Sequence, residues 1–166
     1  MEKEFFYFTP KHLWREMQIE PVNNYDACKL LVETDPIVSD SRYIVKKGSK
    51  HYDIIPYLDW MQFLISEKFK NILERENFNG YKCFAADIEG VSDTYFGWLN
   101  ICEVGPIIKN DWDKEITWFD LKTWHGFDIF HLKDTKMNVC TKEVRDVIER
   151  ENITNIKFES CIGVEV

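Results

Sequence analysis

The sequence predicts an α+β fold with mainly antiparallel pairing, in which two related strand–helix–strand units pack within one domain. Two observations predict this class. The segment of residues 64–84 recurs as residues 139–159, and short apolar segments bounded by Gly, Pro and Asn surround both copies. Because 166 residues and 19.9 kDa match one ordinary domain, we treat residues 1–166 as a single domain with an internal repeat.

The two copies of the repeat share the features of a capped amphipathic helix. They have the sequences LISEKFKNILERENFNGYKCF and VCTKEVRDVIERENITNIKFE, and the tetrapeptide Glu-Arg-Glu-Asn occurs in both. Ser66 and Thr141 are good N-caps, because a side-chain oxygen can accept a free backbone N–H. Apolar residues then recur at intervals of three and four. This spacing predicts helices over 67–76 and 142–151.

Each predicted helix is followed by a turn and a strand. Asn77 and Asn152 are suitable helix ends, since Asn tolerates the left-handed backbone conformation. Gly80 supplies the turn in the first copy, and Asn155 occupies the matching position in the second. Other strands are expected where β-branched and aromatic residues lie between turn residues. Taken together, the predicted strands cover residues 4–9, 42–46, 52–55, 81–86, 94–103, 116–121, 127–132 and 156–159.

Three local features lie outside the repeat. The turn at 47–50 predicts a hairpin between the strands on either side of it. Gly97 indicates a bulge or the close approach of another backbone. Residues 11–35 stay ambiguous, because a helix-like spacing at their start is broken by Pro21.

Composition excludes several classes of protein. The chain has 21 Lys and Arg against 29 Asp and Glu, a net charge of −8, which disfavours general binding to nucleic acid. The N-terminus lacks the apolar core of a signal peptide, and no stretch approaches the length of a membrane span. Five widely spaced cysteines fit a reducing compartment, where they serve as small buried residues. We therefore expect a cytoplasmic protein without membrane contact.

No motif of nucleophilic, nucleotide-binding or metal-dependent chemistry is present. P-loop, dinucleotide-binding, nucleophile-elbow and zinc-protease patterns are all missing from the sequence. His125, Asp128 and His131 form the best metal-like cluster, but a strand would turn Asp128 away from the two histidines. We expect no catalytic residue, no metal and no cofactor.

Acidic residues concentrate between the two copies of the repeat. Residues 87–134 contain ten acids and four bases, so this stretch carries −6 of the net charge. One interpretation is a solvated acidic loop; another is an anionic surface that steers a cationic partner, with a tryptophan as its anchor. The second interpretation places a partner-binding surface in the 109–120 loop, at Asp111, Trp112, Asp113, Glu115, Trp118 and Asp120.

The stretch from residue 52 to residue 160 resembles immunity proteins of bacterial polymorphic-toxin systems. The similar features are the two repeat copies and, between them, the strand TYFGWLNI and the aromatic segment GFDIFHL. The resemblance implies a non-catalytic inhibitor that binds a cognate toxin domain. A basic toxin, with a nuclease as one hypothesis, would suit an acidic inhibitor. The alternative is a small enzyme or ligand-binding domain with an aromatic pocket, using His125 or His131 with a carboxylate.

Overall fold

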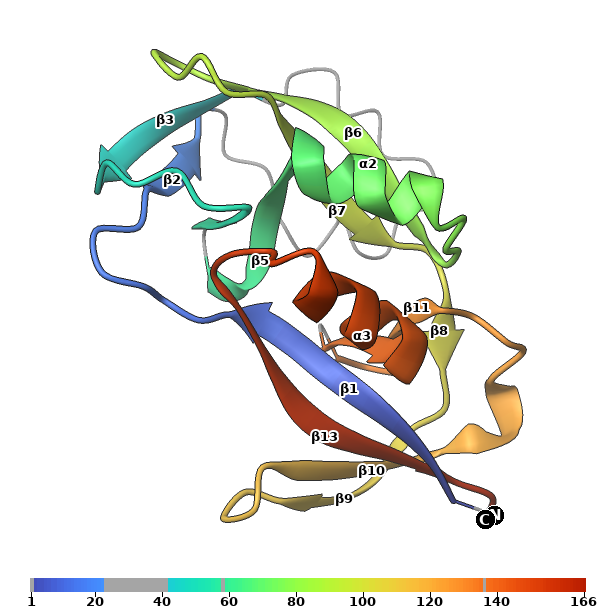
Figure 1. Ribbon diagram of the computed structural model, residues 1–166. Coiled ribbons are helices and arrows are strands. Elements are labelled where there is room, and N and C mark those ends of the chain that lie inside the picture. Colours follow the sequence, from blue (N-terminus) through green and yellow to red (C-terminus); the bar gives the residue numbers. More distant parts are fainter. Residues whose placement is uncertain (1, 23–41, 58, 136) are drawn as a thin grey trace.

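The computed structural model describes residues 2–22, 42–57, 59–135 and 137–166 (Figure 1). This part of the chain is mostly β-sheet, with two α-helices and one short 3-10 helix. The α+β class is therefore right in its coarse form, although strands outweigh helices. None of the helices in the described ranges is long and apolar enough to cross a membrane.

One sheet has seven strands, in the spatial order β8-β11-β12-β1-β13-β10-β9. Two of its neighbouring pairs, β10 with β13 and β11 with β8, are parallel, and the others are antiparallel. The strand bounds are β1 Glu2–Pro10, β8 Glu103–Val104, β9 Ile107–Asp111, β10 Ile116–Asp120, β11 Ile129–Leu132, β12 Asn138–Thr141 and β13 Ile156–Val164.

The other sheet has six strands and closes on itself, in the order β2-β3-β6-β7-β5-β4. Here β2 with β4 and β3 with β6 are the parallel pairs. The strand bounds are β2 Gln18–Pro21, β3 Arg42–Lys47, β4 Ile54–Tyr57, β5 Asp59–Ser66, β6 Tyr81–Ile88 and β7 Tyr95–Asn100. Antiparallel pairs are in the majority in both sheets, as predicted, but the sheets are mixed.

The two helices lie within one residue of their predicted bounds: α2 is Glu67–Arg75 and α3 is Lys142–Arg150. The Ser66 hydroxyl accepts the backbone N–H of Phe69 at 3.1 Å, so Ser66 caps α2 as expected. Thr141 occupies the same position before α3 but makes no side-chain cap hydrogen bond. The predicted cap is therefore confirmed for the first helix only.

The expected left-handed residues follow both helices. Asn77 and Asn152 have φ values of 59° and 53°, and Asn155 has a φ of 63°. Gly80, with a φ of 97°, lies so close to the backbone that an added Cβ would be 1.8 Å from the Ile129 carbonyl oxygen. Asn and Gly adopt this conformation at a lower cost in free energy than other residues, which accounts for their presence at these sites.

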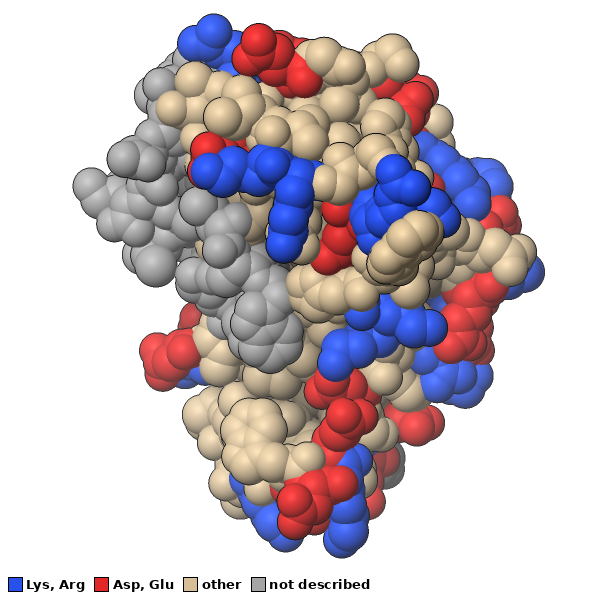
Figure 2. All heavy atoms as spheres, turned by 90° about the vertical axis from the view of Figure 1, so that its left-hand side faces the viewer, with Lys and Arg blue, Asp and Glu red and all other residues tan. Residues whose placement is uncertain are grey.

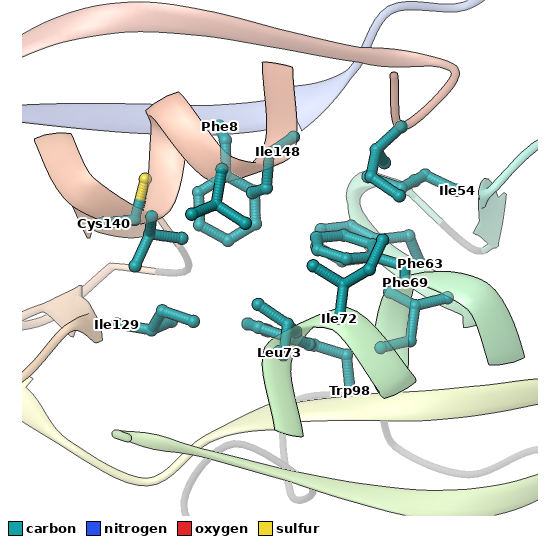
Figure 3. Close-up of a cluster of buried hydrophobic side chains, with 14 of the residues drawn as sticks. Phe8, Ile54, Phe63, Phe69, Ile72, Leu73, Trp98, Ile129, Cys140 and Ile148 are labelled. Atoms are coloured by element: carbon teal, nitrogen blue, oxygen red, sulfur yellow. The ribbon is translucent and has the colours of Figure 1, made fainter. Parts of the chain in front are cut away.

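The main hydrophobic core lies between the two helices and joins strands of both sheets (Figure 3). Leu73 of α2 and Ile148 of α3 are 0% and 1% exposed, as their helical spacing predicts. Strand β1 is apolar throughout its centre because both of its faces are covered. Phe6 and Phe8 enter the main core, whereas the alternate residues Phe5 and Tyr7 enter a second cluster on the opposite face.

The predicted hairpin around residues 47–50 is wrong. Strands β3 and β4 do not pair with each other, because β2 lies between them and pairs with both. A short chain connection favours a hairpin, but here the edges of β3 and β4 that would face each other both pair with the earlier strand β2.

Two further predictions at single residues need comment. The close approach at Gly97 is real, but its neighbour is a side chain: an added Cβ would meet the Phe84 ring at 1.9 Å. Among the cysteines, Cys140 and Cys161 are buried as expected, and Cys83 and Cys102 are half-buried. Cys28, like residues 23–35 of the ambiguous segment, lies outside the described residues.

Candidate functional site

The predicted 109–120 loop is a hairpin in the structure. Strands β9 and β10 pair antiparallel, and a four-residue turn at 112–115 joins them. Glu115 closes the turn with a left-handed φ of 53°, and its N–H donates to the Trp112 carbonyl at 3.4 Å. The first strand was not predicted, because Ile107–Asp111 carries only two apolar residues before polar ones.

The hairpin brings four of the six predicted site residues together. Asp111, Trp112, Asp113 and Glu115 all lie at or beside its tip. Trp112 is 78% exposed, the highest value among the large hydrophobic side chains of the described residues. The tip therefore presents an aromatic ring among carboxylates.

One of the acids at the tip has a basic neighbour. Lys114 forms an ion pair with Asp111 at 3.3 Å. Desolvation raises the pKa of the Asp111 carboxyl, but hydrogen bonds and the charge of Lys114, together with Lys109, outweigh it and lower the pKa below its ordinary value. Asp113 and Glu115 are exposed to solvent.

The other two predicted residues lie further along β10. Trp118 is half-buried, with the Lys109 ammonium 5.0 Å from its ring centroid. Asp120 lies at the far end of the strand, where it caps the 3-10 helix η1 (Leu121–Thr123) by accepting the Lys122 N–H at 3.0 Å. Asp120 therefore has a local structural role and is not part of the tip.

The hairpin also supplies a strand edge. Within the described ranges, β9 pairs with β10 alone and ends the order of its sheet. Ile108 on this strand is 45% exposed. An edge of this kind leaves backbone N–H and C=O groups open to pairing with another chain.

The acidic stretch of the sequence does not form one surface. The turn between β6 and β7, which holds Glu89 and Asp93, lies at the opposite end of the molecule from the β9–β10 hairpin (Figure 1). Glu103 approaches His131, with 3.4 Å between Oε2 and Nε2. Only part of the clustered charge is therefore at the tip.

The histidine cluster weighed in the sequence is dispersed. His125 is exposed in the segment before β11, while His131 lies on that strand beside Glu103. Asp128 faces another partner, since its carboxylate accepts the Asn79 N–H at 2.9 Å. Across the described part of the chain, no group of three or more His, Cys, Asp or Glu side chains could hold a metal ion.

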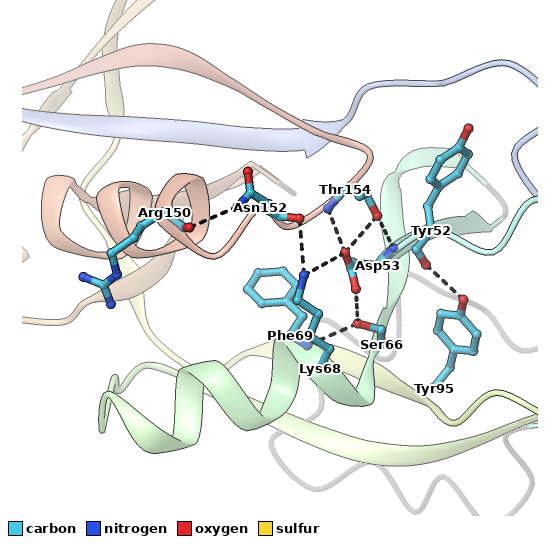
Figure 4. A network of polar contacts seen from close by, with 9 residues as sticks. All are labelled: Tyr52, Asp53, Ser66, Lys68, Phe69, Tyr95, Arg150, Asn152 and Thr154. Atoms are coloured by element: carbon cyan, nitrogen blue, oxygen red, sulfur yellow. Dashed lines mark hydrogen bonds and ion pairs between the residues drawn. The ribbon is translucent and has the colours of Figure 1, made fainter.

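Asp53 is the centre of a polar network that was not predicted (Figure 4). Its carboxylate accepts the Ser66 hydroxyl at 2.6 Å and both the N–H and the hydroxyl of Thr154 at 2.8 Å. The Asp53 N–H in turn donates to the Thr154 hydroxyl at 2.8 Å. Because the Ser66 hydroxyl also caps α2, the network joins the start of this helix to the loop after α3.

A matching contact occurs 75 residues later. Asp128 and Asn79 exchange hydrogen bonds just as Asp53 and Thr154 do, at 2.9 and 3.3 Å. The loop after α2 is therefore bonded to the residue that precedes β11, and the loop after α3 is bonded to the residue that precedes β4. The signal was available in the sequence, because Asp-Ile at 53–54 recurs at 128–129 and extends the repeat upstream.

The repeated Glu-Arg-Glu-Asn tetrapeptides also meet. Arg75 pairs with Glu151 at 2.7 Å, and Arg150 pairs with Glu76 at 3.4 Å. Each copy thus supplies one arginine and one glutamate to the other. Such reciprocal contacts are typical of an interface related by twofold symmetry.

A second exposed tryptophan was missed as a site residue. Trp14 is 74% exposed and lies beside a surface groove of about 790 Å³, which is lined by His12, Arg15, Lys47 and Ser49 among others. The two segments of this groove, 12–18 and 47–49, are distant in sequence, so no local pattern indicates it.

Searches against protein-family models and against curated proteins found no match to the chain.

Proposed function

We propose that the protein is a non-catalytic binding protein, an immunity protein that neutralises a cognate toxin domain through the tip of the β9–β10 hairpin. One observation carries the proposal: Trp112 is 78% exposed at the end of the hairpin, between Asp111 and Asp113. An aromatic ring in solvent contributes little to folding, whereas tryptophans that become buried on association are common hot spots of protein interfaces.

The charges at the tip support a cationic partner. Asp113 and Glu115 are exposed, and they lie on the two sides of the one lysine in the turn. Carboxylates placed around an aromatic anchor accelerate the encounter with a basic surface and disfavour acidic competitors. A toxin domain that acts on nucleic acid would carry such a basic surface.

The free edge of β9 gives the same surface a second means of contact. A partner segment in extended conformation can add to the edge through backbone hydrogen bonds, while Trp112 and Ile108 bind its side chains. This mode needs no catalytic group. It also leaves the repeat-derived core as the scaffold that holds the hairpin.

The scaffold itself supports a finer proposal about its origin: the chain contains two related units. Strand β7 pairs with β5 and β6, and β1 pairs with β12 and β13 in the corresponding register, with Tyr95 opposite Ser66 and Phe5 opposite Thr141. The helices between these strands and the reciprocal contacts after them also correspond at an offset of 75 residues.

The test is co-expression with the toxin domain encoded beside this protein, followed by co-purification and a binding assay. Trp112→Ala should weaken binding by about thirtyfold or more, the equivalent of a hot spot worth ~2 kcal/mol. The triple variant D111K/D113K/E115K should slow association at low salt by about tenfold or more. A matched control reverses three other exposed acids, Glu2, Glu4 and Glu89.

The control separates a local surface from the net charge of the molecule. If both triple variants lose the same association rate, the tip has no special role. If the Trp112→Ala variant protects cells and binds the toxin as the unchanged protein does, the hairpin is not the interface. Absence of any complex with the neighbouring toxin domain would overturn the immunity function itself.

A further inference from the structure

Trp14 is the centre of a basic surface that the sequence does not reveal. Its ring lies 5.2 Å from the Arg15 guanidinium carbon and 5.6 Å from the Lys50 ammonium nitrogen, while 74% of the residue stays exposed. Lys11 and Lys47 are exposed on the same two segments. We refer to the exposed residues Lys11, Trp14, Arg15, Lys47 and Lys50 as the Trp14 platform.

The cations of the platform are not neutralised. Within the described part of the chain, Lys11, Arg15, Lys47 and Lys50 form no ion pair with a carboxylate, although the net charge of the molecule is −8. The one acid in the adjoining groove, Glu16, is buried at 6% exposure: its carboxylate accepts the Asn155 side-chain N–H at 2.9 Å and lies 2.8 Å from Nδ1 of His12. The platform is therefore a positive surface on a negative protein.

The backbone beneath the platform is held in place. Asn155, buried at 3% exposure, accepts the Leu13 N–H with its side-chain oxygen at 3.2 Å. The Arg15 carbonyl accepts the N–H groups of Ser49 and Lys50, at 3.1 and 2.9 Å. Ordering of this kind before binding reduces the entropy cost of association, so the arrangement favours recognition.

Left-handed backbone adds to this constraint. His12 and Arg15 have φ values of 60° and 59°, a conformation that costs free energy in residues other than Gly. Gly48 completes the fit, because an added Cβ would lie 1.8 Å from the Glu16 carbonyl oxygen. The surrounding contacts thus maintain a strained loop that displays Trp14.

We propose that the Trp14 platform binds an acidic polypeptide segment, one whose Asp and Glu side chains contact Arg15, Lys47 and Lys50 while an apolar side chain covers Trp14. Arginine and tryptophan together are the residue types most enriched in the hot spots of protein interfaces. The groove beside the ring, about 790 Å³ in volume, is lined by polar groups that suit carboxylates, including Arg15, Lys47 and Ser49.

The wider surface favours a polypeptide over a nucleic acid. Figure 2 faces the side of the molecule where β2 and β3 lie. It shows Lys and Arg side chains across the middle, Asp and Glu side chains at the top, and both kinds mixed at the lower end. A long polyphosphate would meet those carboxylates and the overall charge of −8. A short acidic segment within a folded partner meets only the platform.

In one respect the proposal rests on the proposed function, since it assigns this surface to the same toxin partner. A partner that binds both the acidic hairpin tip and the basic platform must itself carry a basic and an acidic region. The platform can nevertheless be tested without the toxin, so its failure is distinguishable from failure of the immunity function.

The experiment is an NMR titration of the full chain with three probes at equal ionic strength. These are a ten-residue peptide of Asp and Glu around one Leu, the same peptide with Lys in place of the acids, and a twelve-nucleotide oligo-dT strand. The acidic peptide should shift the Trp14 indole N–H and the amides of residues 11–15 and 47–50. The Trp14 signal is identified by its loss in Trp14→Phe.

Two charge variants distinguish a site from bulk charge. K47E/K50E should weaken binding of the acidic peptide by about tenfold or more, whereas K122E/K133E, with the same change in net charge at exposed lysines elsewhere, should leave it within about twofold. Equal losses in the two variants would overturn the proposal. So would an absence of shifts with the acidic peptide, or tighter binding of oligo-dT at the same residues.

Discussion

At the scale of single residues, identity within the repeat has a physical cause. Arg75 and Glu76 of one Glu-Arg-Glu-Asn tetrapeptide face Glu151 and Arg150 of the other. Where two copies meet around a twofold relation, each residue must complement the other copy of its partner. At the apolar positions of the repeat only the hydrophobic character has to be kept, as with Leu73 and Ile148.

The ion pair between Arg75 and Glu151 predicts a local change in pKa. A hydrogen bond from Arg75, followed in size by opposing desolvation and by the charges of Arg75 and Arg150, lowers the pKa of the Glu151 carboxyl. Arg75→Ala should therefore raise the pKa of Glu151 toward its ordinary value, as measured by carbon-detected NMR titration. The pKa of Asp146, lowered by Lys142, should not move and is the control.

The sign of the pH dependence follows from the direction of this shift. A carboxyl whose pKa is lower in the folded state stabilises the fold above its unfolded pKa, and this contribution is lost as pH falls through the folded pKa. Arg75→Ala should thus make stability less dependent on pH on the acidic side. A pKa of Glu151 that is unchanged in the variant would show that the ion pair is not formed in solution.

The close contact of Gly80 with the backbone predicts a loss of stability on substitution. Gly80→Ala should lower the free energy of unfolding by more than Gly126→Ala, measured by urea denaturation. Both glycines have positive φ, 97° and 86°, but an added Cβ meets the Ile129 carbonyl only at Gly80 and nothing within 4 Å at Gly126. Strain alone costs about 1–2 kcal/mol, so the difference between the variants reports the backbone contact. Equal losses would contradict it.

At the scale of elements, local signals predicted local structure. Both helices were predicted to within one residue, since the cap position, the periodicity and the left-handed Asn all lie within one short segment, 66–77 or 141–152. The hairpin at 47–50 was wrong because strand pairing depends on distant segments: β2 inserts between β3 and β4. The residues at the tip of the β9–β10 hairpin are neighbours in sequence, so they could be predicted as a group. The Trp14 platform combines two segments that are distant in sequence, so it could not.

The helices should behave as scaffold elements. Leu73→Ala and Ile148→Ala should each lower the free energy of unfolding by about 2–5 kcal/mol, because both side chains are almost completely buried in the shared core. Ile101→Ala, at a residue that is 50% exposed, should stay within about 0.5 kcal/mol. A small loss at Leu73 together with a large loss at Ile148 would show that the two helices do not share one cooperative core.

At the scale of the whole molecule, the spatial order of the strands differs from their order in the sequence. Strand β1 lies between β12 and β13, where β7 lies between β5 and β6 in the other sheet. The six-stranded sheet thus comes from one continuous stretch of the chain, β2 to β7. The seven-stranded sheet consists of β8 to β13 together with β1 from the opposite end of the chain. The two ends lie side by side, with Glu2 opposite Val164 (Figure 1).

This arrangement predicts that a circular permutant will fold faster than the natural order. If the ends are joined by a short Gly/Ser linker and the chain is opened at Cys102, each sheet comes from one continuous stretch. The β1–β13 pairing, which now joins segments about as far apart as the chain allows, becomes a local hairpin. Folding rates rise as contacting segments come closer in sequence.

The control permutant has the same linker but opens at Gly90, in the turn between β6 and β7, where nothing lies within 4 Å of an added Cβ. It also makes β1–β13 local, but it turns the β6–β7 hairpin into a contact between the two ends of the chain. Stopped-flow refolding should therefore give the fastest rate for the Cys102 permutant and a slower one for the Gly90 permutant. If the Gly90 permutant folds as fast as the Cys102 permutant, continuity of each sheet in the chain does not govern folding, and the two-unit description loses its kinetic consequence.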